Sequence, residues 1–290
     1  MLCAPAPNGS MVIQGIRPGP GYAPYDMNVM DGKDGVSRAI SQTKMWDRAK
    51  TTLLVSELPL LHSELKRRPV VLDIGANLGW FTLLAAASGH ARVISVEASD
   101  QNCLMIERSL CMNGRSYSKH VTLHKMGVGA ITADCALVSR RGNIGSPIAV
   151  CGQDDPASFM NAWGGPRGLR DYIVTGTMHM ARVDDLVKSK VDIIKIDVEG
   201  NELEVTKGWA ELFDRSPPSL VLTEYVPTLI AQVSNTSEPL DYLRFYLQRG
   251  YTIEPAKGKG ITSEAQLQRW AETKASWIND LVIRKGYLHG

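Results

Sequence analysis

The sequence lacks the features that mark membrane proteins, exported proteins and nucleic-acid-binding proteins. No apolar run approaches the roughly 18 residues that a membrane-spanning helix needs. The N-terminus has neither the positively charged start nor the apolar stretch of a secretory signal. Basic and acidic residues nearly balance, with a net charge of +2, and the one basic cluster, Lys66-Arg67-Arg68, is short. The sequence therefore predicts neither a membrane nor a nucleic acid as a partner.

Cysteine is scarce, and its pattern excludes two kinds of site. The chain has five cysteines, an odd number, and no Cys-x-x-Cys pair. We therefore expect neither a disulfide framework nor a structural zinc site. Unpaired cysteines are typical of a reducing compartment, so the predicted location is cytoplasmic. The glycosylation triplets at Asn8 and Asn235 are interpreted as chance matches, because no secretory signal accompanies them.

The most informative segment that is present runs from Val70 to Gly79. An apolar strand ends in an acid, and a turn of small residues leads at once into an apolar helix pattern. A buried parallel strand, followed by a loop that lets a ligand approach the backbone, has this pattern. A second apolar strand, residues 92–97, ends in Glu97, about 20 residues after the loop. An acid at this position binds ribose hydroxyls, so the pair predicts an adenosine-containing ligand.

The residues of the loop discriminate between adenosine ligands. A dinucleotide fingerprint needs glycines at positions 75, 77 and 80, but Asn77 and Trp80 occupy two of them. No Gly-Lys-Ser/Thr follows the turn, which excludes a P-loop. The pattern Asp73-x-Gly75-x-Asn77-x-Gly79 suits S-adenosylmethionine, which has no pyrophosphate to place on a helix N-terminus.

Strand and helix patterns alternate from residue 70 onward, which predicts an α/β fold with a mostly parallel sheet and helices on both faces. The expected strands are residues 70–74, 92–97, 121–125, 191–197, 219–224, 251–254 and 280–284, and the expected helices are 79–88, 100–113, 238–249 and one beginning near 201. Residues 1–65 are predicted to form an N-terminal arm, loose over 1–25, and a helical cap, and residues 66–290 the main domain. The Gly- and Pro-rich segment at about 140–180 is interpreted as a lid-like insertion, with a flexible surface excursion as the alternative.

A cluster of acids follows the fourth expected strand. Three acids, Asp197, Glu199 and Glu202, fall within six residues, and Glu224 ends the fifth strand. Ligands of open α/β sheets bind at the carboxyl ends of the strands, so these acids are candidate site residues. Asp197 is the first candidate for a catalytic base, Glu224 is the second, and His179 is an outside choice. Glu199 is a third candidate for the catalytic group and would contact the acceptor. For both Glu199 and Glu202, the alternatives are a hydrogen bond to the acceptor and a cap on the following helix.

Several motifs together resemble those of the FkbM family of S-adenosylmethionine-dependent methyltransferases. They are Asp73-Ile-Gly-Ala-Asn-Leu-Gly79, Val-Glu97-Ala, Gly127-Val-Gly129, Arg182-Val-Asp-Asp-Leu186, Lys195-Ile-Asp197-Val-Glu199-Gly200 and Leu-Thr-Glu224. The match spans roughly residues 70–225. The resemblance implies a Rossmann-like class I methyltransferase fold, with a seven-stranded sheet of order 3-2-1-4-5-7-6 whose last strand is antiparallel. It also implies O-methylation of a sugar, a polyketide or another small molecule.

The same resemblance implies which residues hold the methyl donor. The loop residues expected to contact its methionine part are Asp73, Gly75, Ala76, Asn77 and Gly79. Glu97, with Ala98 beside it, is expected to bind the ribose, and the turn at Gly127 and Val128 the adenine. Asp197 is expected to face the sulfonium or the amino group of the donor. No acid stands at positions 127–129, so backbone groups are expected to bind the adenine amine.

The motifs leave the acceptor open. A small-molecule acceptor is predicted, but a protein or peptide acceptor and a non-catalytic adenosine-ligand-binding module are alternatives. A nicotinamide-dependent oxidoreductase is disfavoured by Asn77 and Trp80. A divalent metal shared by Asp197 and Glu224 is the less favoured chemistry, because no third ligand is evident and no metal site is assigned. The sequence does not predict the oligomeric state.

Overall fold

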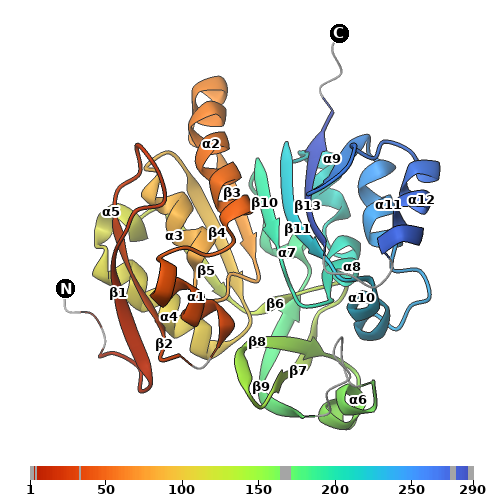
Figure 1. Cartoon of the computed structure of the whole chain (residues 1–290), viewed down its shortest axis with the longest axis horizontal. Helices are drawn as coiled ribbons and strands as arrows, with labels where there is room; N and C mark the ends of the chain where they lie inside the picture. The colour runs from red at the N-terminus through yellow and green to blue at the C-terminus, as the bar shows by residue number, and fades with distance from the viewer. Residues whose placement is uncertain (1–2, 4, 33, 164–170, 275–278, 287–290) are drawn as a thin grey trace. The chain divides into compact units, whose positions relative to one another are not determined.

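The computed structural model describes residues 3, 5–32, 34–163, 171–274 and 279–286 (Figure 1). Its contacts divide the chain into two units, Met1–Gly127 with Ser139–Pro147 and Val128–Val138 with Ile148–Gly290. Both units combine strands with helices, so the expected α/β class is confirmed. None of the helices in the described ranges is long and apolar enough to cross a membrane.

A parallel sheet lies at the centre of the first unit. It consists of β3 (Val70–Ile74), β4 (Arg92–Glu97) and β5 (Val121–Lys125), with β4 in the middle. The helices that follow these strands or connect them are α3 (Trp80–Ala87), α4 (Asp100–Met112) and α5 (Arg115–Ser118). Every residue of β3 and of α3 is buried, which is why both segments are apolar except for Asp73 and Thr82. The predicted bounds of all three strands are confirmed, because a short apolar run that ends at turn residues is a local signal.

The N-terminal residues form a packed hairpin rather than a loose arm. The elements here are β1 (Ser10–Ile16), β2 (Tyr25–Met30), α1 (Gly35–Thr43) and α2 (Arg48–Leu65), and β1 pairs antiparallel with β2. Two hydrogen bonds hold β2 on α4: Asn28 N donates to Ser109 Oγ at 2.8 Å, and Asn113 Nδ2 donates to Asp26 O at 2.7 Å. The prediction of a loose segment was wrong for residues 10–16, because Ile13 and Ile16 are buried only through this long-range packing.

The main sheet of the second unit is mixed. Its strands, in spatial order, are β10 (Ile193–Ile196), β11 (Leu220–Tyr225), β13 (Asn279–Lys285) and β12 (Tyr251–Pro255). β10 and β11 are parallel, whereas β13 is antiparallel to both of its neighbours. The partial orders β5-β4-β3 and β10-β11-β13-β12 are those expected for the two halves of the predicted sheet. The order over all seven strands stays a prediction.

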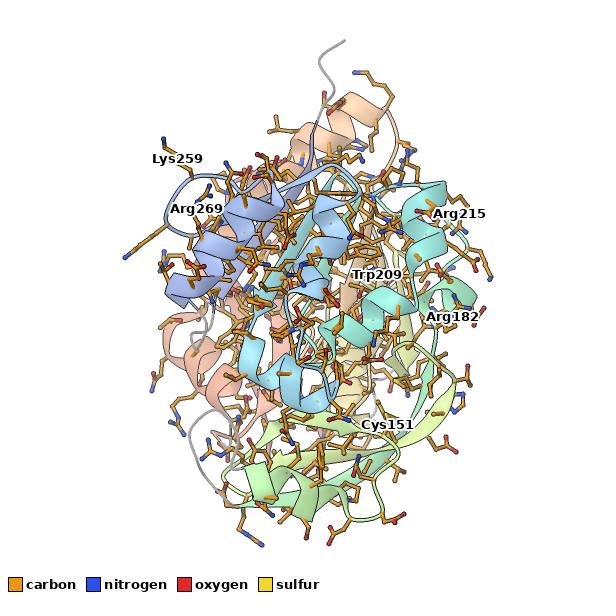
Figure 2. All side chains as sticks on the ribbon, turned by 90° about the vertical axis from the view of Figure 1, so that its right-hand side faces the viewer. Cys151, Arg182, Trp209, Arg215, Lys259 and Arg269 are labelled. Carbon is orange, nitrogen blue, oxygen red and sulfur yellow. A yellow bond between two sulfur atoms is a disulfide. The ribbon has the colours of Figure 1, made fainter. Side chains whose placement is uncertain are left out.

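Helices and an aromatic cluster complete the second unit. The helices are α7 (Val183–Leu186), α8 (Glu202–Lys207), α9 (Ala210–Arg215), α10 (Pro227–Val233), α11 (Asp241–Leu247) and α12 (Glu264–Lys274). Trp209, labelled in Figure 2, is fully buried, and its ring centre lies 5.0 Å from that of Phe213 and 6.4 Å from that of Tyr246. The carboxylate of Asp184 accepts hydrogen bonds from the backbone N–H groups of Glu211 and Leu212 at 3.1 and 2.8 Å. This acid of the Arg182–Leu186 motif therefore caps α9 and has a structural role.

The segment expected as a long loop is mainly β-structure. Its elements are β6 (Gly127–Val128), β7 (Ala133–Arg140), β8 (Asn143–Val150), α6 (Pro156–Trp163) and β9 (Tyr172–Ala181), and the sheet order is β6-β9-β7-β8. Gly145 and Pro147 lie inside β8, which is tolerated because β8 is an edge strand and an edge residue can lack an N–H group. A hydrophobic core includes Val138, Ile148, Val150, Met160, Tyr172, Val226 and Leu229. The prediction of a structureless excursion was wrong for the described part, residues 164–170 lie outside it, and the lid role stays a prediction.

Four of the five cysteines form disulfides, which corrects the expectation from their odd number. Cys3 is bonded to Cys111, and Cys135 on β7 is bonded to Cys151 just after β8. Cys103 is buried and free. The first pair joins residues 108 positions apart, a proximity that sequence spacing does not predict. The prediction of a cytoplasmic location assumed that the cysteines are unpaired, and this assumption was wrong.

Candidate active site

The loop between β3 and α3 has an unusual backbone. Gly75, Asn77 and Gly79 have φ angles of +71°, +53° and +86°, a region that glycine and asparagine enter most readily. The N–H groups of Gly75 and Ala76 both donate to the carbonyl of Val96, at 3.0 and 3.1 Å, and tie the loop to β4. Gly75 and Asn77 are partly exposed, whereas Ala76 is buried. The two partly exposed residues are therefore the ones at which a ligand can approach the backbone.

Close packing against α4 requires a glycine at position 79. A Cβ atom at this position would lie 2.9 Å from Ile106 Cγ1 on α4, and the φ angle disfavours any other residue.

Asp73 is part of the buried core of the first unit. It is fully buried, and Thr82 Oγ1 donates to its Oδ2 at 2.6 Å, while the Thr82 hydroxyl lies 2.8 Å from that of Ser95. Asp73 thus links β3 to α3, and its contact with a ligand stays a prediction.

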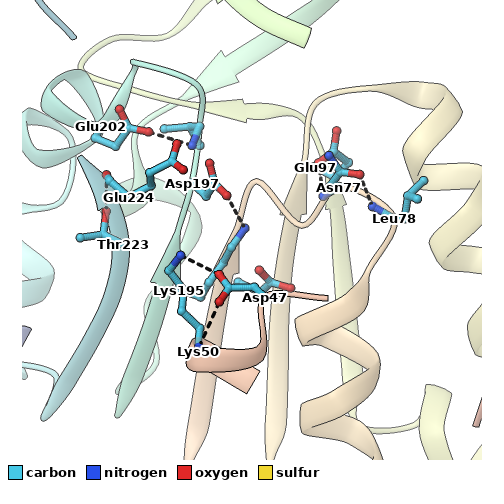
Figure 3. A network of polar contacts seen from close by, with 12 residues as sticks. Asp47, Lys50, Asn77, Leu78, Glu97, Lys195, Asp197, Glu202, Thr223 and Glu224 are labelled. Carbon is cyan, nitrogen blue, oxygen red and sulfur yellow. Dashed lines mark hydrogen bonds and ion pairs between the residues drawn. The ribbon is translucent and has the colours of Figure 1, made fainter. Parts of the chain in front are cut away.

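Glu97 organises the end of β4 (Figure 3). Its side chain is 5% exposed. Oε2 accepts a hydrogen bond from Asn77 N at 2.7 Å, and Oε1 accepts from Ser99 N at 2.9 Å and from Asn102 Nδ2 at 3.2 Å. Charge-assisted bonds of this kind are among the stronger ones in proteins. The carboxylate therefore joins the glycine loop to the start of α4 and does not point into solvent.

The remaining residues expected to hold the donor lie at the end of β4 and in β6. Ala98 is half-buried beside Glu97, and Gly127 and Val128 are both buried. Their contacts with a ligand stay predictions. Asn102, which donates to Glu97, shares the buried face of α4 with Ile106 and Ser109.

The acids of the second unit cluster at the ends of two neighbouring strands (Figure 3). Ile196 of β10 lies opposite Thr223 of β11 in the parallel pairing. Asp197 and Glu224 directly follow these two residues in the chain. The side chain of Asp197 is 34% exposed and lies 4.0 Å from Lys195 Nζ. Parallel strands end on the same side, so the structure brings the two predicted base candidates to one edge of the sheet.

A strained turn follows Asp197. Glu199 and Gly200 have φ angles of +52° and +95°. A Cβ atom at Gly200 would lie 2.6 Å from Leu229 Cγ, so only glycine fits there. Val198 N donates to Glu202 Oε1 at 3.0 Å, which closes the turn. Glu202 is buried and holds the turn through this contact, and its role as a helix cap stays a prediction.

Burial and like charges favour the protonated forms of two of these acids. Desolvation raises the pKa of Glu199 well above its usual value, and the carboxylates of Asp197, Glu224 and Glu202 raise it further. Burial also raises the pKa of Glu202, to about 7. A glutamate that keeps its proton is a poor base but a good hydrogen-bond donor. Glu199 therefore suits the expected acceptor contact better than proton abstraction.

His179, the outside candidate, has another partner. It lies on β9, and its Nδ1 is 3.0 Å from Asp134 Oδ1 on β7. Both side chains are more than half exposed, which is typical of a surface ion pair. Among the described residues, no three His, Cys, Asp or Glu side chains are grouped as metal ligands would be.

Comparisons with known proteins identify the family. A family model described as the methyltransferase FkbM domain matches residues 73–253, more than half of the chain. No protein with a curated description matches the sequence. Among solved structures, methyltransferase FkbM from Methylobacillus flagellatus KT is similar at 17% identity and a TM-score of 0.42, over 75% of this chain and 43% of that one. The chain thus spans less than half the length of that relative.

Two further solved structures are similar to this chain at comparable sequence identity and TM-score. Precorrin-6y C5,15-methyltransferase from Geobacter metallireducens GS-15 has 15% identity and a TM-score of 0.40, over 84% of this chain and 92% of that one. An O-methyltransferase from Bacillus cereus, in complex with SAH, has 13% identity and a TM-score of 0.39, over 87% and 97%. These likenesses are remote, and the family assignment depends on the family model. The chain has the Rossmann-like class I fold of methyltransferases and belongs to the FkbM methyltransferase domain family.

Proposed function

We propose that the chain transfers a methyl group from S-adenosylmethionine to a hydroxyl group of a small molecule. The observation that carries the proposal is the loop at residues 75–79, which Glu97 holds through Asn77 N at 2.7 Å. A nucleoside fits this arrangement, since the carboxylate offers only acceptor atoms and ribose hydroxyls are donors. The loop has no dinucleotide pattern, which supports a ligand without a pyrophosphate.

The residues proposed to bind the donor are Gly75, Ala76, Asn77, Glu97, Ala98, Gly127 and Val128. When bound, S-adenosylmethionine supplies a methyl group that its sulfonium already activates. The protein then contributes mainly position and exclusion of water. A hydroxyl acceptor still has to lose its proton as the new bond forms. We assign this proton to Asp197, whose carboxylate is one-third exposed, with Glu224 on the next strand as the second choice.

Isothermal titration calorimetry with S-adenosylhomocysteine tests the donor site. Glu97→Ala is expected to weaken binding by about 1–3 kcal/mol, because it removes a buried acceptor for the ribose and releases the loop. Glu107→Ala is the matched control, since Glu107 is an exposed glutamate of the same unit that pairs with Lys125 at 2.6 Å. Equal affinity of wild type and Glu97→Ala would contradict the assigned site, and no binding to wild type would contradict the function.

The acceptor is tested separately with labelled donor. The protein is incubated with S-adenosylmethionine that carries a labelled methyl group and with a metabolite extract, and the label is traced by mass spectrometry. Label on a small-molecule oxygen is the expected result. Label confined to protein would point to the rival peptide acceptor, and binding without any transfer would point to a non-catalytic module.

A further inference from the structure

Asn201 stands at the N-cap position of α8, but its side chain does not cap the helix. Asparagine is common at this position because its side-chain oxygen accepts a hydrogen bond from an N–H group of the first turn. Within the part of the chain that the structure describes, α8 has no such bond. Asn201 is 6% exposed, so its amide needs a partner inside the protein. The inference below rests on the proposed function, because it concerns the acids that are proposed to act on the acceptor.

The amide of Asn201 binds the edge strand β8 instead. Its Nδ2 donates to the carbonyl oxygen of Ala149 at 3.1 Å. The nitrogen must face this carbonyl, because a flipped amide would set two oxygens against each other. The two residues are 52 positions apart in the chain, and both belong to the second unit. The start of α8 is therefore fastened to a distant strand rather than to its own first turn.

The residue before Asn201 is fixed on another side. A Cβ atom at Gly200 would lie 2.6 Å from Leu229 Cγ and 3.1 Å from the backbone carbonyl of the same leucine, so the turn lies directly against α10. Leu229 shares a hydrophobic core with Val150, the neighbour of Ala149. The turn after Asp197 is thus held by β8 and by α10, and these two elements are themselves packed together.

These contacts stabilise the unusual backbone of Glu199. Its φ angle is +52°, a region that a residue with a Cβ atom enters only at a cost in free energy. Such a conformation persists where the surrounding contacts enforce it. The contacts of Gly200 and Asn201 directly follow Glu199 in the chain and supply this constraint. Without the bond from Asn201, the turn would lose its anchor on β8.

The Glu199 carboxyl lies among other charged groups of the same unit. The groups that act on it are the carboxylates of Asp197, Glu224 and Glu202 and the ammonium group of Lys195. Desolvation is nevertheless the largest cause of its raised pKa. Because desolvation requires that the turn stay closed to water, the pKa of Glu199 reports how firmly the turn is held.

We propose that Asn201 is a positioning residue, which directs Glu199 toward the acceptor by fixing the turn after Asp197 on β8. Asn201 contacts neither the donor nor the acceptor in this role and acts through Glu199. The role explains why an asparagine occupies an N-cap position that it does not use for capping.

The test is a titration of the Glu199 carboxyl by carbon-13 NMR, with Glu199→Gln to assign its signal. Asn201→Ser is the test variant, because serine is a good N-cap residue but its side chain is too short to reach Ala149. Glu199 of this variant is expected to titrate about one pH unit or more below that of wild type, since the loosened turn admits water.

Asn161→Ala is the matched control. Asn161 Nδ2 donates to the carbonyl oxygen of Tyr172 at 3.0 Å, so this amide joins α6 to β9 in the same unit. Its removal also costs one hydrogen bond between an amide and a carbonyl, and it is expected to leave the titration of Glu199 unchanged.

The titration separates a positioning role from a structural one. A purely structural Asn201 would lower the stability of Asn201→Ser and leave Glu199 titrating as in wild type, which would overturn the proposal. Wild type decides the matter if the variant does not fold: slow solvent exchange of the Asn201 side-chain amide protons supports the anchor, and fast exchange contradicts it. Neither measurement uses donor or acceptor, so failure to bind S-adenosylhomocysteine would remove the proposed function alone.

Discussion

Replacement of Glu202 by glutamine is expected to stabilise the protein at neutral and alkaline pH. Glu202 is 3% exposed. Burial raises its pKa from 4.5 to about 7, and the hydrogen bond from Val198 N opposes this rise without cancelling it. Below pH 4.5 the carboxyl is protonated in both the folded and the unfolded chain. Between pH 4.5 and 7 the unfolded chain ionises first, so the folded state loses stability, and above pH 7 the loss is complete.

The size of the effect follows from these two values. A carboxyl whose pKa rises from 4.5 to about 7 on folding lowers the free energy of unfolding by about 3 kcal/mol at high pH. Glutamine is neutral at every pH and keeps a carbonyl oxygen for Val198 N. Glu202→Gln should therefore exceed wild type in stability by up to about 3 kcal/mol above pH 7, with the difference shrinking toward pH 4.5.

Urea denaturation followed by tryptophan fluorescence at a series of pH values measures this difference. Groups that titrate equally in both proteins cancel in the comparison. Glu211→Gln is the control, because Glu211 is 68% exposed and such substitutions usually stay within about 0.5 kcal/mol. A stability difference that does not depend on pH, or that grows toward low pH, would refute the raised pKa of Glu202.

Three further outcomes are expected. Asp197→Asn should lower methyl transfer by about 10²–10⁴-fold, measured with labelled donor, with little change in S-adenosylhomocysteine affinity; an equal loss in both would make it a binding residue only. Alkylation of the denatured, unreduced chain should label Cys103 alone by mass spectrometry, and five labelled cysteines would disprove both disulfides. Asp184→Ala should cost about 1–3 kcal/mol in urea denaturation, because two backbone N–H groups of α9 lose their acceptor, whereas the exposed Asp185→Ala should cost little; similar costs would contradict the capping role.

Much of the fold of the first unit could be predicted from local sequence patterns. The bounds of β3, β4 and β5 agree with the expected strands, and α4 begins at residue 100 as expected. Apolar runs, helical periodicity and turn residues act over a few positions, so they can be read without knowledge of the fold. The same holds for the motif that ends in Glu97, because its spacing from the glycine loop reflects one helix and one strand.

Other sequence-based expectations failed because the relevant partners are distant in the chain. The Gly- and Pro-rich stretch around Gly145 was expected to be a loop, but pairing at a sheet edge makes it a strand. Asn102 has no motif of its own, and its amide is held by two acceptors, one of them 43 residues away. Composition gives no sign of such neighbours.

By itself, the sequence determined the family, the order of strands and helices between residues 70 and 125, and the acids at the strand ends, since each depends on residues close together in sequence. The tertiary structure alone decided which cysteines pair, which donors surround Glu97, and which glutamates have raised pKa values. Those properties depend on distances and burial between segments as far apart as Cys3 and Cys111, and packing sets them rather than local pattern.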